Sequence, residues 1–118
     1  MAEPRGAALP GADLIEQGLA DLRAGDDNTV AALLVQIGAP RLRRVGIAVP
    51  PLPPRDTSSE LVLYLALAAD GDDDALSRYN ALIRRLVSFE RALELETAIA
   101  ARARARDAWT GSTSRGVD

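Results

Sequence analysis

The densest group of metal-ligand side chains in the sequence is the acidic run Asp70-Gly71-Asp72-Asp73-Asp74. Ca²⁺ prefers carboxylate oxygens, and an EF-hand loop places them at alternating positions, with glycine at the sixth position and glutamate at the twelfth. Counted from Asp70, the glycine is second and the twelfth residue is Ala81. The run therefore suits the negatively charged start of a helix, and we predict no metal site in this chain.

A second candidate for acid chemistry is the pair Glu90 and Glu94. Residues four apart share a helical face, and paired carboxylates can transfer protons or hold metal ions. Di-metal helical bundles combine such glutamates with histidines, which this chain lacks. With Arg84, Arg85 and Arg91 close by in the sequence, the pair indicates a solvated face of mixed charge.

The chain contains neither histidine nor cysteine. Histidine is the side chain that titrates near neutral pH and the commonest transition-metal ligand, and cysteine supplies thiolate nucleophiles and disulfides. Serine–histidine, cysteine–histidine, zinc and haem chemistry are therefore excluded for this chain alone. We expect no catalytic residue and no cofactor, and predict a non-catalytic protein.

All fourteen basic residues are arginine, which indicates the compositional bias of a bacterial-type genome. Glycine and proline at 38 and 40 predict a turn, so the segment 29–46 forms a helix–turn–helix-like hairpin. Its second helix carries the possible nucleic-acid-binding residues Arg41, Arg43 and Arg44. Such positions contact phosphates and base edges in DNA readers, although the net charge of −3 opposes binding by the whole domain. The competing interpretation is a solvated face, or ion pairs with the acidic residues at 26 and 27.

Tyr79 and Arg84 define a third candidate site. Residues three and four apart share a face of a helix, so Ser77, Tyr79 and Asn80 could line a pocket beside Arg84 for an anionic small ligand. The competing interpretation places Tyr79 at the edge of the core with its hydroxyl group in water.

The elements that must position these residues are predicted to be helical. Apolar side chains recur at helical spacing, and the expected fold is an all-α, small bundle of about five helices. The expected helices span 12–24, 29–37, 40–45, 61–69 and 75–108. We expect a flexible N-terminal segment at 1–11, one helical domain at 12–108 and a disordered tail at 109–118.

Four prolines within residues 50–54 forbid helix and favour an extended spacer, 50–56, inside the domain. After it, Thr57 and Glu60 fit a capping box, and the run Leu61 to Ala69 is apolar on every side. This run must be covered on nearly all faces, by the core or by a second copy. An α+β alternative, with short strands at 44–49 and 61–67, stays open because such a run has no diagnostic periodicity.

The last predicted helix is longer than a domain of this size needs, which indicates a kink or a contact with a partner. Its apolar face supplies the possible partner-binding residues Leu82, Leu86, Phe89 and Leu93. We therefore predict a protein–protein interaction module, either a homodimer or larger homo-oligomer or a binder of another protein. Nucleic acid is the alternative partner, and a small nucleic-acid-binding regulator is the alternative function.

The location of the protein follows from two segments. Met1 to Pro10 carries Glu3 and Arg5 and lacks the apolar stretch of a signal peptide. The longest apolar run is about half of the roughly twenty residues that a membrane-spanning helix needs. We expect a cytoplasmic protein with no membrane partner.

Overall fold

The computed structural model describes residues 9–69, 71 and 73–116, with side chains as far as Trp109. Its elements are four helices: α1 (Ala12–Arg23), α2 (Val30–Arg44), α3 (Ser59–Ala69) and α4 (Ala75–Gly116). The described part of the chain contains no strand, so the all-α prediction is confirmed. The α+β alternative is wrong, because 61–67 lies inside α3 and 45–49 forms a turn followed by irregular chain.

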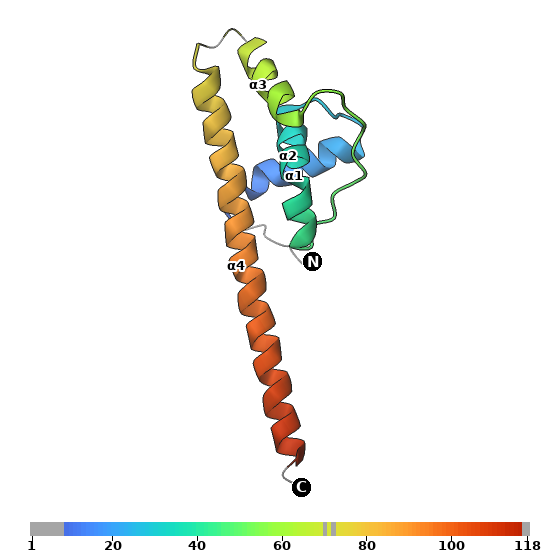
Figure 1. Ribbon diagram of the computed structural model, residues 1–118, viewed down its shortest axis with the longest axis vertical. Helices are drawn as coiled ribbons and strands as arrows, with labels where there is room; N and C mark the ends of the chain where they lie inside the picture. Colours follow the sequence, from blue (N-terminus) through green and yellow to red (C-terminus); the bar gives the residue numbers. More distant parts are fainter. Residues whose placement is uncertain (1–8, 70, 72, 117–118) are drawn as a thin grey trace.

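Helix α2 is the centre of the bundle. It is covered by α1, which crosses it, and by the antiparallel pair α3 and α4 (Figure 1). Most of its side chains are buried, with Leu33, Leu34 and Leu42 completely so. The largest buried groups that pack with α2 are Leu63 and Leu67 of α3 and Phe89 and Leu93 of α4.

The prediction of two helices at 29–37 and 40–45 is wrong, because α2 continues through Gly38 and Pro40. Proline removes one helical hydrogen bond, but the packing of α2 on its neighbours maintains the helix. Gly38 is needed for that packing: a Cβ atom there would lie 2.8 Å from Cδ1 of Leu86 and 3.0 Å from Oε2 of Glu90. The helix–turn–helix-like hairpin at 29–46 is therefore not formed.

Helix α2 ends instead at Gly46, which has a φ of 94°. The Gly46 N–H donates to the carbonyl of Arg43 (3.0 Å), and the Ile47 N–H donates to that of Leu42 (3.0 Å). This pattern is a Schellman motif, which terminates a helix and turns the chain. The chain then leaves α2 toward the proline-rich spacer.

Helix α1 matches its prediction to within one residue and packs unusually close to α2. A Cβ atom at Gly18 would lie 2.2 Å from the carbonyl oxygen of Ala31, so glycine permits the two backbones to approach. After α1, the chain turns at Gly25, which has a φ of 86°. Thr29 then caps α2 by accepting a hydrogen bond from the Ala32 N–H (3.0 Å).

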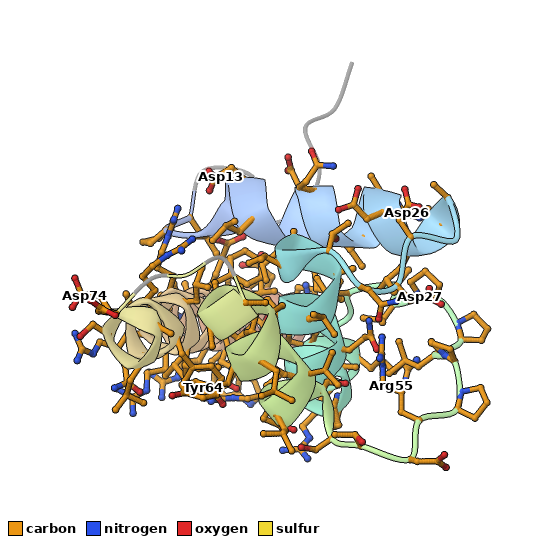
Figure 2. All side chains as sticks on the ribbon, turned by 90° about the horizontal axis from the view of Figure 1, so that it is seen from above. Asp13, Asp26, Asp27, Arg55, Tyr64 and Asp74 are labelled. Carbon is orange, nitrogen blue, oxygen red and sulfur yellow. The ribbon has the colours of Figure 1, made fainter. Side chains whose placement is uncertain are left out.

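The proline-rich spacer is fixed to the bundle by Arg55. Its Nε donates to Oε1 of Gln36 (2.8 Å), and its Nη2 donates to the carbonyl of Asp27 (2.8 Å) and to Oδ1 of Asn28 (3.0 Å). Gln36 itself donates to the same Asp27 carbonyl (2.7 Å). In Figure 2, Arg55 points from the spacer toward the turn that carries Asp27. The spacer is thus part of the domain.

Helix α3 is less buried than its sequence predicts. Leu63 and Leu67 are fully buried, but Leu61 and Leu65 are 48% and 53% exposed. The expectation that neighbours cover nearly all faces of this run is therefore wrong, because α2 and α4 pack on one side only. Its N-cap is also one residue later than predicted: Ser58 Oγ accepts from the Leu61 N–H (3.3 Å), and Thr57 does not cap the helix.

Helix α4 has 42 residues, which corresponds to about 63 Å, and the molecule measures 72 × 30 × 26 Å. In Figure 1, the helix runs as one continuous rod and its C-terminal half projects beyond the bundle. The backbone stays helical to Gly116, beyond the predicted end at 108. Of the predicted tail, 117–118 lie outside the described residues, as do 1–8 of the predicted N-terminal segment; Leu9 packs on the core.

The close contact at Gly18 makes a prediction about stability. We expect Gly18→Ala to lower the free energy of unfolding by about 1–3 kcal/mol, because the added methyl group meets a backbone carbonyl that cannot move aside. Gly38→Ala is the matched control: there the neighbour is the flexible end of Leu86, so the loss should be smaller. Urea unfolding measures both. A Gly18→Ala variant as stable as the wild type would contradict the close packing.

The Arg55 contacts make a second prediction. We expect Arg55→Ala to lower the free energy of unfolding by about 1–3 kcal/mol, because it removes three hydrogen bonds from a charged donor. Arg43→Ala is the control, since Arg43 is exposed and donates one hydrogen bond, to the Pro50 carbonyl (3.0 Å). Thermal and urea unfolding of the two variants should separate them; equal losses would show that the spacer is not held through Arg55.

Candidate functional site

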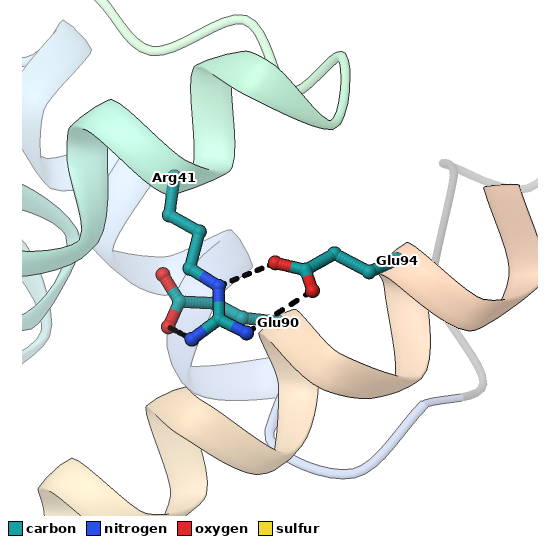
Figure 3. A network of polar contacts seen from close by, with 3 residues as sticks. All are labelled: Arg41, Glu90 and Glu94. Carbon is teal, nitrogen blue, oxygen red and sulfur yellow. Dashed lines mark hydrogen bonds and ion pairs between the residues drawn. The ribbon is translucent and has the colours of Figure 1, made fainter. Parts of the chain in front are cut away.

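The polar contacts between α2 and α4 centre on Arg41, which lies between Glu90 and Glu94 (Figure 3). Its Nη2 donates to Oε2 of Glu94 (3.1 Å), its Nε donates to the other oxygen of the same carboxylate, and its Nη1 lies 3.5 Å from Oε1 of Glu90. The glutamates were predicted to form a solvated face. Instead they hold α4 against the end of α2.

The two glutamates differ in burial. Glu90 is only 3% exposed, and this burial raises the pKa of its carboxyl group, with the charge of Arg41 acting in the opposite direction. The hydrogen bond from Arg41 lowers the pKa of Glu94. The carboxyl groups of Glu90 and Glu94 are therefore both paired with Arg41. Among the described residues, no group of three or more acidic side chains is arranged to hold a metal ion.

The three arginines of the predicted nucleic-acid surface are separated by this arrangement. Arg41 is ion-paired with α4, which replaces the predicted pairing with residues 26 and 27. Arg43 is exposed and donates a hydrogen bond to the Pro50 carbonyl. Arg44, the next residue, is also exposed. No turn precedes them, since α2 is continuous. The structure therefore has no separate helix at 40–45, and Arg43 and Arg44 lie at the exposed end of α2.

The predicted partner-binding residues lie on the face of α4 that packs against the bundle. Leu86, Phe89 and Leu93 are buried and Leu82 is half-buried, all within the chain's own core. Leu86, Phe89 and Leu93 are therefore not accessible to a partner in this fold. The helical spacing identified an apolar face correctly, but spacing carries no information about which molecule covers that face.

Tyr79 and Arg84, the residues of the predicted small-ligand pocket, lie in different surroundings. The ring of Tyr79 meets the edge of the Tyr64 ring, with centroids 6.2 Å apart and planes at 80°, and Arg84 points to solvent. This edge-to-face contact joins α4 to α3. In the acidic run, Asp70 and Asp72 lie outside the described residues, and Asp73 and Asp74 are exposed.

A cavity of about 190 Å³ lies elsewhere, between α1, the chain after α2, and α4. Its apolar wall comes from Ile15 and Leu19 of α1, Ile47, and Phe89 of α4, and two charged residues of α1, Glu16 and Arg23, also line it. Ala48 lines it as well and is exposed, so the cavity reaches the surface. The walls of this site come from three separate segments of the chain, so no local sequence pattern predicts it.

The second feature is the projecting part of α4, which we call the α4 arm and define as residues 95–109. Every described side chain from 98 to 109 is exposed. Leu95 is 63% exposed and Ile99 is 59% exposed, and Trp109 is also exposed. Leu95 follows buried Leu93 by two residues, which places it on the opposite side of a helix. In the sequence, this spacing of two residues between Leu93 and Leu95 is the pattern that could have predicted an apolar surface outside the core.

The comparisons with known proteins add no relative: no family model, no curated protein and no solved structure matches this chain. In the described part of the chain, no helix has both the length and the apolar character needed to cross a membrane. The α4 arm and the cavity are therefore the two features of this chain that bear on its function.

The Arg41 contacts make a prediction about pH. The hydrogen bond lowers the pKa of Glu94 below its usual 4.5, so its contribution to stability is present above pH 4.5 and is lost as the pH falls through the lowered value. We expect Glu94→Gln to be less stable than the wild type at pH 7, with the difference shrinking below pH 4.5. Urea unfolding across this range measures it.

Glu96→Gln is the control for this experiment, because Glu96 is exposed on the opposite side of α4 from Glu94. The burial of Glu90 has the opposite effect on the pH dependence of stability, because it favours the folded state as that carboxyl group gains a proton. This effect is present in the wild type and in both variants. A stability difference for Glu94→Gln that stays constant with pH would contradict the assigned hydrogen bond.

Proposed function

We propose that this protein is a non-catalytic interaction module that self-associates through the α4 arm. The observation that carries the proposal is the exposure of Leu95 and Ile99, one turn apart, on a helix that continues beyond its own bundle. Large apolar side chains that lie together on a projecting helix mark a binding surface. The arm, which ends at Trp109, extends about 24 Å past the buried residue Leu93.

The energetics of an isolated helix support this proposal. A helix of fewer than about 15 residues is marginal in water without packing, and α4 has only exposed described side chains from 98 onward. Complete burial of a leucine or isoleucine side chain contributes about 1.5–3 kcal/mol. Covering Leu95 and Ile99 would thus stabilise the arm and drive association together.

The chemistry of the remaining residues also supports a non-catalytic role. The carboxylates of Glu90 and Glu94 are both bound to Arg41 and hold two helices together. The lining of the cavity offers Glu16 and Arg23 as its charged side chains, and the sequence supplies no histidine or cysteine to act with them. Binding requires only the apolar and charged surface that the arm presents.

Analytical ultracentrifugation of the full chain tests this proposal. We expect the wild type to form a dimer or larger assembly, and the double variant Leu95→Glu, Ile99→Glu to sediment as a monomer with a folded circular dichroism spectrum. The two introduced glutamates replace the apolar surface of the arm with charge. They do not enter the core, since Leu95 and Ile99 are both more than half exposed. The variant should weaken association by at least a hundredfold, because the interface would bury four such side chains.

Leu76→Glu is the matched control, because Leu76 is equally exposed on α4 but lies at its opposite end. It should keep the assembly of the wild type. A wild-type chain that stays monomeric at all concentrations would contradict the proposed function. Loss of assembly in Leu76→Glu and not in the double variant would move the surface to the other end of the helix.

A further inference from the structure

The α4 arm and the cavity beside Phe89 have complementary chemistry. The cavity has an apolar wall and is lined by two charges of opposite sign, Glu16 and Arg23. On the arm, Ile99 is exposed and lies between Glu96, three residues before it, and Arg102, three residues after it. Both surfaces therefore combine one apolar centre with one acid and one base.

The spacing of the charges also agrees. Glu16 and Arg23 are seven residues apart on α1, which corresponds to about 10.5 Å along the helix. Glu96 and Arg102 are six residues apart on α4, or about 9 Å. If the arm lies antiparallel to α1, Arg102 comes opposite Glu16 and Glu96 comes opposite Arg23, with Ile99 facing the cavity between them.

A cavity of about 190 Å³ is large enough for this side chain. An apolar cavity of about 150 Å³ accepts a benzene molecule, which has more carbon atoms than the side chain of isoleucine. Filling the space would bring Ile99 into contact with apolar groups and remove it from water. Each contact of this kind contributes to association in proportion to the apolar area covered.

The arm of the same chain cannot reach this cavity. Ile99 follows Phe89, which lines the cavity, by ten residues on one continuous helix, so the two lie about 15 Å apart along its axis. The end of α2, from which residues 46–48 continue into the cavity wall, lies on the side of the bundle toward which the arm projects (Figure 1). A second copy can therefore approach from that side.

From these observations we infer that the cavity is the receptor for Ile99 of a second copy, with Arg102 of that copy against Glu16 and its Glu96 against Arg23. The inference rests on the proposed self-association and names the surface that receives the arm. With two-fold symmetry each copy inserts its arm into the other, so both cavities are filled and the assembly closes as a dimer.

Cysteine crosslinking tests the contact, because the natural chain contains no cysteine. Full-length chains carrying Ala48→Cys, at the exposed edge of the cavity, are mixed with full-length chains carrying Ile99→Cys and oxidised mildly. We expect a disulfide between the two different chains, identified by mass spectrometry of the linked peptides. Leu76→Cys replaces Ile99→Cys as the control, and should give at least tenfold less crosslinked product.

Charge reversal provides the second test. Glu16→Arg should weaken the dimer about tenfold in sedimentation measurements, since it places like charges together at both contacts, and adding Arg102→Glu in the same chain should restore the dimer. Both side chains are exposed in the monomer, so neither change disturbs the core. Rescue by the second reversal is not expected from a merely structural effect of the first.

The outcomes separate this inference from the proposed function. A selective 48–99 crosslink together with charge rescue supports the assigned receptor. A wild-type dimer that gives no selective crosslink overturns the receptor and leaves the self-association intact. Crosslinking that is equal for positions 76 and 99 in a dimeric chain likewise overturns only the receptor. A chain that is monomeric at every concentration overturns both.

Discussion

Close approach of α1 and α4 to α2 is the constraint on which the rest of the structure depends. At Gly18 the backbone of α1 lies almost against the carbonyl of Ala31, and at Gly38 the side chains of Leu86 and Glu90 occupy the space of a missing methyl group. A core built mainly from alanine and leucine has few large aromatic groups to span wider gaps. Short distances between helices replace them, because dispersion contacts weaken quickly with separation.

The Arg41 contacts determine where the bundle ends along α4. Leu93 is the last fully buried residue of α4 among those whose side chains are described, up to Trp109. Glu94 is held by Arg41, and Leu95 already faces solvent. Burying a charged group costs free energy because the group leaves water, so a buried ion pair contributes little net stability. Hydrogen bonds to a guanidinium group require strict geometry, however. The three nitrogen donors of Arg41 therefore fix the register of α4 on α2. The projecting arm begins from this fixed point.

The arm and the cavity are two places in the described residues where the chain leaves its own packing incomplete. Elsewhere in the described residues, exposed leucines of α3 adjoin a covered face of the same helix, which is ordinary for a protein surface. The arm differs because its exposed apolar groups continue after the bundle has ended. If the arm of one copy entered the cavity of another, one contact would cover the exposed arm and fill the cavity, with no rearrangement of the core.

The sequence by itself determined the all-α class, the bounds of α1, the long last helix and the apolar face of residues 82–93, because these follow from local propensity and helical spacing. It failed at Gly38 and Pro40, whose usual effect of ending a helix was overcome by packing on α1 and α4. It also could not show that Arg41 pairs with glutamates about fifty residues away. Only the tertiary structure decided which apolar faces are covered, where a cavity forms and which residues remain on the arm, since each of these depends on contacts between segments that are distant in the chain.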